Sequence, residues 1–218
     1  MKRIVTPFLA AIIIGALALF GVYIESKINP QPKSEYLWYD TIRELNNMAR
    51  LKYRQSIRYA LYSAHAEKEG LHNEAPLLRA IAKADAIQCE NCIKAINSLG
   101  GVYHSPVSVD ANIQSTRQHL RLISDEKSAF HLHHIHHLIT QTLNEGNRYI
   151  ARMLTWCEAS DIEQIIILRQ TLQQGKEADT LNNQYSVCPV CGNLTNKELT
   201  SYRCAHCMTP NEEFLIFK

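Results

Sequence analysis

The sequence predicts an all-α fold, in which an up-down-down-up four-helix bundle follows an apolar N-terminal segment and precedes a small four-cysteine domain. Three observations lead to this prediction: long stretches with apolar residues at helical spacing, glycine-containing breaks between them, and two C-x-x-C pairs near the C-terminus. The 8 glycines and 7 prolines in 218 residues are too few for many strands and tight turns. A hydrophobic content of 46% suffices for one medium-sized core and a small appendage.

The charge balance argues against nucleic acid as a partner. The formal net charge is +2, from 23 basic and 21 acidic residues. Proteins that bind nucleic acid concentrate lysine and arginine in one stretch or on one face, and this sequence has no basic stretch interleaved with aromatic residues. We therefore expect no nucleic-acid partner.

The first element is an apolar run, residues 4–24, that contains no charged side chain. A helix of this length, at about 1.5 Å per residue, spans a hydrocarbon core of roughly 30 Å. Lys2 and Arg3 precede the run and are expected to hold the N-terminus in the cytoplasm. We expect residues 1–26 to form a single-pass transmembrane anchor and residues 27–35 a short stiff tether, with the main domain on the outer, periplasmic face of the membrane.

A cleaved signal peptide is the alternative for this segment. Its apolar region usually has about 7–15 residues and ends at a small-x-small site. The sequence Ala16-Leu17-Ala18 would serve as that site, but the apolar run continues past it to Ile24. The length of the run favours the uncleaved anchor, and cleavage stays open.

The bundle is expected within residues 36–178. The predicted helices cover residues 36–68, 76–99, 115–145 and 148–174. Gly70, Gly100 and Gly146 follow the first three, as C-terminal glycines do. The longer link at residues 102–110 joins two helical hairpins, which is the connectivity of an up-down-down-up bundle. Ser115-x-x-Gln118 is a capping-box pattern at the start of the third helix.

Four of the seven cysteines form two C-x-x-C pairs, Cys188 with Cys191 and Cys204 with Cys207, with twelve residues between the inner cysteines. Two such knuckles bring four thiolates to one tetrahedral ion, and Gly192 permits a left-handed backbone after the first pair. Two local disulfides are the weaker interpretation, because a C-x-x-C disulfide closes a very small loop. The pattern predicts one metal ion, and the ligands suit either Fe or Zn.

Several stretches also match a known family. They are residues 58–70, 77–101 and 116–147, the knuckle at residues 188–192, the twelve-residue spacing, and Phe214. Together they resemble the rubrerythrins, in a match that covers residues 41–218. The resemblance implies a ferritin-like bundle, a rubredoxin-like domain over residues 184–218, and a homodimer. Met208 departs from the glycine that is usual in the second knuckle.

The activity of rubrerythrins depends on a di-iron site inside the bundle. The family supplies a Glu from the first helix, Glu-x-x-His from the second, two Glu from the third and Glu-x-x-His from the fourth. The resemblance places these ligands at Lys52, Asp85, Gln88, Lys127, Phe130, Asp161 and Gln164. None keeps the family residue, and neither a lysine ammonium nor a phenylalanine has a lone pair to offer a metal. We therefore expect no di-iron centre.

The replacements match one another in charge. Asp-x-x-Gln occurs on both the second and the fourth helix, and a lysine replaces a Glu on each of the other two. We predict a buried network of Lys52, Lys127, Asp85, Asp161 and the two glutamines, in which two ammonium groups take the place of the metal charge. In the alternative, the bundle is rotated and the lysines extend to water, so that Lys52→Met costs almost nothing.

The predicted third helix also contains several histidines that are potential metal ligands. The histidines are His131, His133, His134, His136 and His137. Spacings of three and four place His133, His134 and His137 on shared faces, as a Zn, Cu or haem site requires, but solvated surface is the favoured interpretation.

The remaining cysteines are Cys89, Cys92 and Cys157. A pair of thiols, Cys92 with Cys157, or a metal between them and a histidine, is the alternative to core packing, which is favoured for free cysteines. Tyr59 matches a family tyrosine near the metals and is expected to be a buried phenol that needs a hydrogen-bond partner.

These features favour a non-enzymatic electron-transfer protein, in which a four-thiolate iron centre passes single electrons to an unknown redox partner. The first alternative is a rubrerythrin-type peroxide reductase, active in oxidative stress, with metal held by unexpected residues. The second is a structural or partner-binding module that contains Zn. Colour distinguishes the metals, because a four-thiolate iron centre is red and redox-active, whereas a zinc centre is colourless and silent.

Overall fold

The computed structural model describes most of the chain after the N-terminal segment. The described residues are 38–106, 108–130, 134–174 and 183–218. The chain divides into two compact units, Met1–Tyr39 and Asp40–Lys218, and both the bundle and the four-cysteine region belong to the second. The expected transmembrane anchor and tether lie outside the described residues. Within the described ranges, no helix has the length and hydropathy to cross a bilayer.

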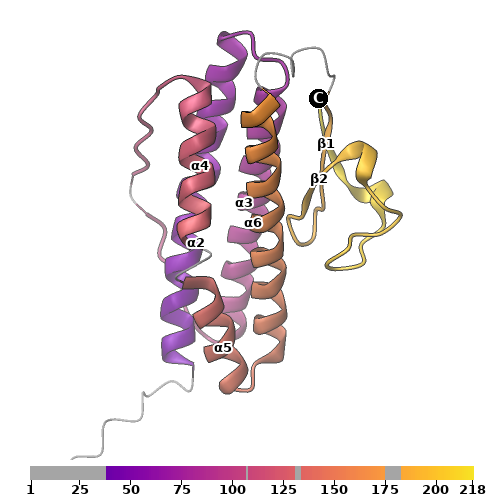
Figure 1. The fold of residues 1–218 in the computed structure, drawn as a ribbon. Helices are drawn as coiled ribbons and strands as arrows, with labels where there is room; N and C mark the ends of the chain where they lie inside the picture. The colour runs from indigo at the N-terminus through magenta and orange to yellow at the C-terminus, as the bar shows by residue number, and fades with distance from the viewer. Residues whose placement is uncertain (1–37, 107, 131–133, 175–182) are drawn as a thin grey trace, which may run out of the picture. The chain divides into compact units, whose positions relative to one another are not determined.

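The second unit consists mainly of helices. They are α2 (Tyr39–Lys68), α3 (Glu74–Ser98), α4 (Thr116–Phe130), α5 (His136–Asn144) and α6 (Arg148–Gln174). Figure 1 shows α2, α3, α4 and α6 running alongside one another, with the link between α3 and α4 crossing the length of the bundle. The expected up-down-down-up bundle is therefore confirmed. The glycine ends are also confirmed, since Gly70 and Gly146 have φ of 74° and 81°.

The expected third helix differs from the structure in one detail. Residues His134 and Ile135 form a π-helical turn between α4 and α5, so the prediction of one uninterrupted α-helix is wrong there. Counting at α-helical period from the buried Lys127 puts residue 134 on the inward face. The π-helical turn adds one residue to that count. Ile135 is consequently buried and His134 is exposed, which keeps a histidine out of the apolar core.

The start of α4 is held partly by its own capping residues and partly by α2. The Ser115 N–H and hydroxyl both donate to Oε1 of Gln118, at 3.1 and 2.7 Å. The capping box is therefore half formed, because the hydroxyl turns to the glutamine instead of to the helix amides. Glu69 instead accepts the Thr116 N–H at 3.1 Å, which joins the end of α2 to the beginning of α4.

The four-cysteine region contains a small antiparallel sheet. Its strands are β1 (Tyr185–Val187), β2 (Leu194–Asn196) and β3 (Leu215–Phe217), in the order β2-β1-β3. Two 3-10 turns, Lys197–Leu199 and Asn211–Glu213, complete the region. Buried side chains of the sheet, among them Val187 and Leu194, belong to the same apolar core as Leu78 of α3 and Leu168 of α6. Figure 1 shows the sheet beside these two helices.

Candidate metal centre and the charged core of the bundle

The two cysteine knuckles have the same backbone plan. In the first, the Gly192 N–H donates to the Cys188 carbonyl at 3.0 Å, and Gly192 has φ of 76°. In the second, the Met208 N–H donates to the Cys204 carbonyl at 3.0 Å, and Met208 has φ of 67°. The left-handed conformation expected at Gly192 is confirmed.

The methionine at position 208 therefore adopts the backbone conformation of the glycine that it replaces. A left-handed residue with a Cβ costs about 1–2 kcal/mol, because the Cβ approaches the following carbonyl oxygen. Met208 is 59% exposed, so its side chain is not confined by a packed core. The second knuckle keeps its geometry despite the departure from glycine.

The four sulfur atoms converge on one point. The Sγ atoms of Cys188 and Cys207 are 3.4 Å apart, those of Cys191 and Cys204 are 3.5 Å apart, and all four lie within 4.8 Å of one another. A tetrahedral ion bound at about 2.3 Å separates its sulfur ligands by roughly 3.8 Å. The donor set and its spacing thus fit one metal ion with four thiolate ligands. Among the described residues, this is the only group of three or more His, Cys, Asp or Glu side chains whose potential ligand atoms lie this close together.

The knuckles differ in exposure. Cys188, Cys191 and Cys204 are buried, whereas Cys207 is half-buried. Hydrogen bonds from the Cys191 and Cys204 thiols, and then from backbone amides of the knuckle, lower the pKa of Cys188 well below its usual range. The centre is closed to solvent on the side of the bundle and reaches the surface at Cys207.

The bundle holds the first knuckle through its backbone carbonyls. The Asn91 side-chain amide of α3 donates to the Val190 carbonyl at 2.8 Å, and the Ser160 hydroxyl of α6 donates to the Gly192 carbonyl at 2.9 Å. A Cβ at position 192 would lie 2.8 Å from the Ala84 carbonyl oxygen, so only glycine fits against α3. Position 192 therefore requires glycine for its φ and for this close approach.

The charged residues at the positions that the resemblance matched to di-iron ligands meet in the middle of the bundle. The Lys52 ammonium lies 3.1 Å from Asp85 and 2.6 Å from Asp161. The Lys127 ammonium lies 2.9 Å from each of the same two carboxylates. The structure thus brings together, from four helices, the four charged side chains that were expected to meet. We call Lys52, Asp85, Lys127 and Asp161 the charged core.

The charged core is buried and electrically balanced. Its four residues are at most 4% exposed, and the two ammonium groups face two carboxylates. Burial acts to lower the pKa of Lys127, but Asp161 and Asp85 outweigh it, so the pKa of Lys127 is raised. Burial likewise acts to raise the pKa of Asp161, but Lys127 and Lys52 hold it below its usual range. Each charge is stable here only because its partners are present.

The two glutamines expected in this network are not bonded to the charged groups. The Gln164 amide nitrogen donates to the Ser160 hydroxyl at 3.3 Å, and neither amide atom of Gln88 has a hydrogen-bond partner among the described residues. The expectation of a six-residue network is therefore wrong for Gln88 and Gln164. The four charged groups bond to one another without the glutamine amides. Phe130 packs against the apolar core that contains Cys89, Cys92 and Cys157.

The histidines of the third helix do not form a ligand cluster among the described residues. His134, His136 and His137 are exposed, and the His134 ring stacks on Phe130 at 5.6 Å. His131 and His133 lie outside the described residues, so a metal site that includes His133 stays a prediction. The exposure of the others agrees with solvated surface.

The remaining cysteines pack in an apolar core. Cys89, Cys92 and Cys157 are buried and unpaired, together with side chains such as Leu45 and Ile150. Burial raises the pKa of all three thiols, to about 11 for Cys89 and about 12 for Cys157. They are accordingly protonated at neutral pH and lack the thiolate that redox chemistry requires, in agreement with core packing.

Tyr59 is buried and has a hydrogen-bond partner, as expected, but its partner Glu126 and the buried His119 were not anticipated from the sequence. The Tyr59 hydroxyl donates to Glu126 at 3.2 Å, and Glu126 also forms an ion pair with Arg58. His119 is buried, stacks on Tyr62 at 3.7 Å, and accepts the Gln114 N–H at 2.8 Å. The only signal for Glu126 was its place next to Lys127, and nothing in the local pattern distinguished His119.

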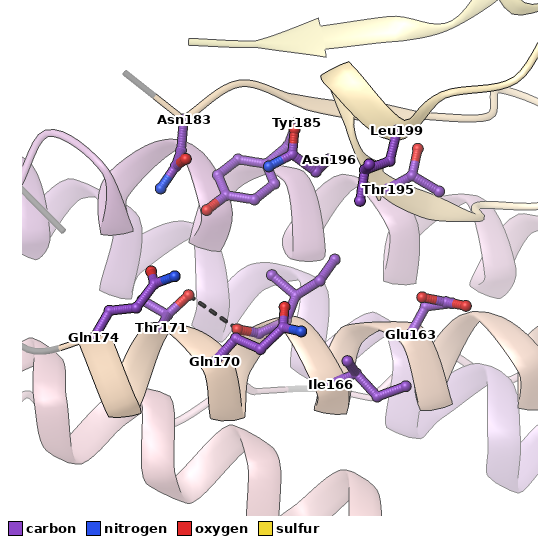
Figure 2. Close-up of a pocket in the computed structure, with 11 residues that line it drawn as sticks. Glu163, Ile166, Gln170, Thr171, Gln174, Asn183, Tyr185, Thr195, Asn196 and Leu199 are labelled. Atoms are coloured by element: carbon purple, nitrogen blue, oxygen red, sulfur yellow. Dashed lines mark hydrogen bonds between the residues drawn. The ribbon is translucent and has the colours of Figure 1, made fainter. Parts of the chain in front are cut away.

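A cavity of about 360 Å³ lies between α6 and the four-cysteine region. Figure 2 shows it between a row of α6 side chains, including Glu163, Gln170 and Gln174, and Tyr185 and Thr195 opposite. The Thr171 hydroxyl in its wall is already bonded to the Ile167 carbonyl at 2.9 Å. The wall is mostly amide, hydroxyl and aliphatic, and it includes none of the cysteines.

Solved structures share this architecture. Nigerythrin, in its fully reduced, all-ferrous state, is 17% identical, with 81% of this chain and 86% of that chain covered and a TM-score of 0.73. The chain shares the fold of nigerythrin. The rubrerythrin-like architecture expected from the sequence, a ferritin-like bundle with a C-terminal four-cysteine region, is confirmed at the level of fold. No protein-family model matches the sequence, and no curated protein matches it.

Ferritins match a smaller share of the chain. The open-pore ferritin of the archaeon Archaeoglobus fulgidus is 12% identical, with 64% of this chain and 85% of that chain covered and a TM-score of 0.55. The bacterioferritin of Desulfovibrio desulfuricans, solved with its di-iron site in different catalytic states, is 14% identical. That comparison covers 66% of this chain and 84% of the bacterioferritin, with a TM-score of 0.57.

Proposed function

We propose that the chain is a membrane-anchored, rubrerythrin-like electron-transfer protein with a single four-thiolate iron centre. The observation that carries the proposal is the contrast between its two potential metal positions. Four convergent sulfur atoms are suited to one ion, whereas the di-iron positions are filled by a balanced set of lysines and aspartates.

The chemistry of the charged core supports the loss of the di-iron site. Each carboxylate at these positions contacts both ammonium groups, so a cation would have to displace Lys52 and Lys127 from their partners. A displaced ammonium would be left buried without a counter-charge, which costs several kcal/mol in real proteins. The bundle then serves as a scaffold for the four-cysteine region.

A four-thiolate iron ion has no open coordination position, so it supplies one-electron transfer instead of substrate binding. The residues of this chain would hold the iron at the surface, since Cys207 is half-buried and Val190 and Met208 beside it are exposed. These apolar side chains would let a redox partner approach the sulfur atom closely.

The membrane location is part of the same proposal. Residues 4–24 would anchor the chain, and the proline-containing tether would place the bundle on the outer face of the membrane. A homodimer and an unidentified redox partner complete the proposal.

Metal analysis and a visible spectrum of the purified full-length chain in detergent test it. One iron per chain, with a red thiolate charge-transfer spectrum that bleaches on reduction, is the expected result. One iron at the cysteines plus two in the bundle would contradict the ligand assignment and favour a peroxide reductase.

A zinc-containing structural module is the second candidate. The observation in its favour is the set of hydrogen bonds by which Asn91 and Ser160 fix the first knuckle to the bundle, as expected of a site that holds two parts of a chain together. One zinc per chain and a colourless protein would decide for this candidate.

A further inference from the structure

Three buried amide side chains near the first knuckle have polar atoms that lack a hydrogen-bond partner. Both amide atoms of Gln88, Oε1 of Gln164 and Oδ1 of Asn193 have no hydrogen-bond partner among the described residues. The exposed fractions of these residues are 0%, 0% and 3%. We call these three side chains the amide seam. Such groups are uncommon in folded proteins, and each needs a physical explanation.

The members of the seam lie around a single backbone position. The Cγ of Gln88 is 3.3 Å from the place that a Cβ of residue 192 would occupy. On the other side, Gln164 bonds to the Ser160 hydroxyl, which in turn bonds to the Gly192 carbonyl. Asn193 follows Gly192 in the chain. The seam therefore lies between α3, α6 and the first knuckle.

The seam also borders the charged core. Gln88 follows Asp85 by three residues on α3, and Gln164 follows Asp161 by three residues on α6. Residues three apart are neighbours on one face of a helix. Gln88 and Gln164 thus each lie one helical turn from a buried carboxylate of the charged core, and both also lie close to the backbone of the first knuckle.

The unpartnered donors and acceptors of the amide seam could all form hydrogen bonds with water. The seam has three unpartnered acceptor oxygens and one amide nitrogen with two donor hydrogens. A water molecule offers two donors and two acceptors, and a buried water typically makes about three hydrogen bonds to groups of this kind. The two glutamine oxygens cannot bond to each other, because both are acceptors.

We propose that the amide seam is a binding site for ordered internal water, held by Gln88 and Gln164 and closed by the first knuckle. The bound water completes a hydrogen-bonded connection from the Gly192 carbonyl through Ser160 and Gln164 towards the charged core. The proposal concerns the interface between the bundle and the knuckle, and it holds whether the cysteines bind iron or zinc.

The first test needs no substitution. In the full-length, zinc-loaded chain, the side-chain amide protons of Gln88 should show nuclear Overhauser contacts to water that is long-lived in the interior. A crystal structure of the same protein should show water density within hydrogen-bond distance of both glutamines. Rotated glutamines that bond directly to each other, with no water density between them, would overturn the proposal.

The second test uses the near-isosteric substitutions Gln88→Met and Gln164→Met in the same chain. If water links the two amides, each substitution lowers the midpoint of thermal unfolding by about 2–4 °C, the effect of one hydrogen bond in a protein of this size. The double variant should lose less than the sum, because both substitutions remove the same water.

Gln55→Met is the matched control. Gln55 is also buried and has an unsatisfied Oε1, but it lies on α2 instead of on the two helices that meet Gly192. The change that Gln55→Met causes in the midpoint of thermal unfolding should simply add to the change caused by Gln164→Met in the double variant. If the seam binds no water, each seam substitution should instead raise the midpoint of thermal unfolding, because it removes an unsatisfied amide. Higher midpoints for both seam variants, with additive effects, would therefore refute the water site.

Discussion

The four-cysteine centre and the charged core each bring four side chains together, but they balance the charges of those side chains in different ways. Each brings four side chains to one point, but the cysteines are all of one kind and offer four thiolate ligands that could hold a cation. The charged core contains two groups of each sign and is complete without an added ion. A ligand site and an ion-pair cluster can thus occupy the same fold, and the sign of the charges decides which of the two forms.

The largest effect should come from the cysteines. We expect Cys191→Ser to abolish stoichiometric metal binding, because structural sites of this type contribute about 10–16 kcal/mol of apparent binding free energy through four ligands together. Metal analysis of the purified chain measures this. Cys157→Ser is the control, since Cys157 packs in the apolar core with Cys89 and Cys92 and is not one of the four converging cysteines, so it should leave the metal content unchanged.

The charged core should respond next most strongly. Lys52→Met leaves two buried carboxylates facing one ammonium, and breaking a buried pair in this way costs about 3–5 kcal/mol of unfolding free energy. Urea unfolding followed by helical circular dichroism measures the loss. The exposed Lys68→Met on the same helix should stay within about 0.5 kcal/mol. A similarly small change for Lys52 would mean that its ammonium reaches water and that the charged core does not exist in solution.

The pH dependence of stability should report on the charged core, because two of its groups have shifted pKa values. Asp161 has a lowered pKa, so its contribution is present above the unfolded value of about 3.9 and is lost as the pH falls through the folded pKa. Lys127 has a raised pKa, so its contribution is present below about 10.4 and is lost as the pH rises through the folded pKa. The contribution of these two groups to the unfolding free energy should be constant between these limits.

Urea titrations of the unsubstituted chain and of Lys127→Met at a series of pH values, followed by helical circular dichroism, would isolate the contribution of Lys127. Lys127→Met should remove the alkaline decline that Lys127 causes. A decline of the same size in this variant would assign the alkaline effect to other groups.

The smallest effect should be a stabilisation. Met208→Gly removes a Cβ from a left-handed position, which should stabilise the second knuckle by about 1 kcal/mol. The metal should consequently be released more slowly to a chelator. Val190→Gly, in the first knuckle, is the control, since Val190 has no positive φ and should gain nothing.

Local sequence patterns predicted the parts of the site that depend on short-range chemistry. The cysteine spacing predicted the metal centre because each C-x-x-C pair forms its own turn, and Gly192 has the positive φ expected of it. The helices followed from apolar periodicity and glycine ends, and α6 has the expected bounds. The meeting of Lys52 with Asp161 required the register of a known family in addition, because no local pattern relates residues on different helices.

Tertiary packing decided the details that depend on which groups compete for a partner. The glutamines were expected in the charged core, but each ammonium prefers carboxylates, so Gln88 and Gln164 are displaced towards the knuckle. The π-helical turn at His134 arises because burying Ile135 is more favourable than burying a histidine. Periodicity and spacing report what one segment prefers, whereas these outcomes depend on the relative free energies of contacts between segments, which only the assembled structure contains.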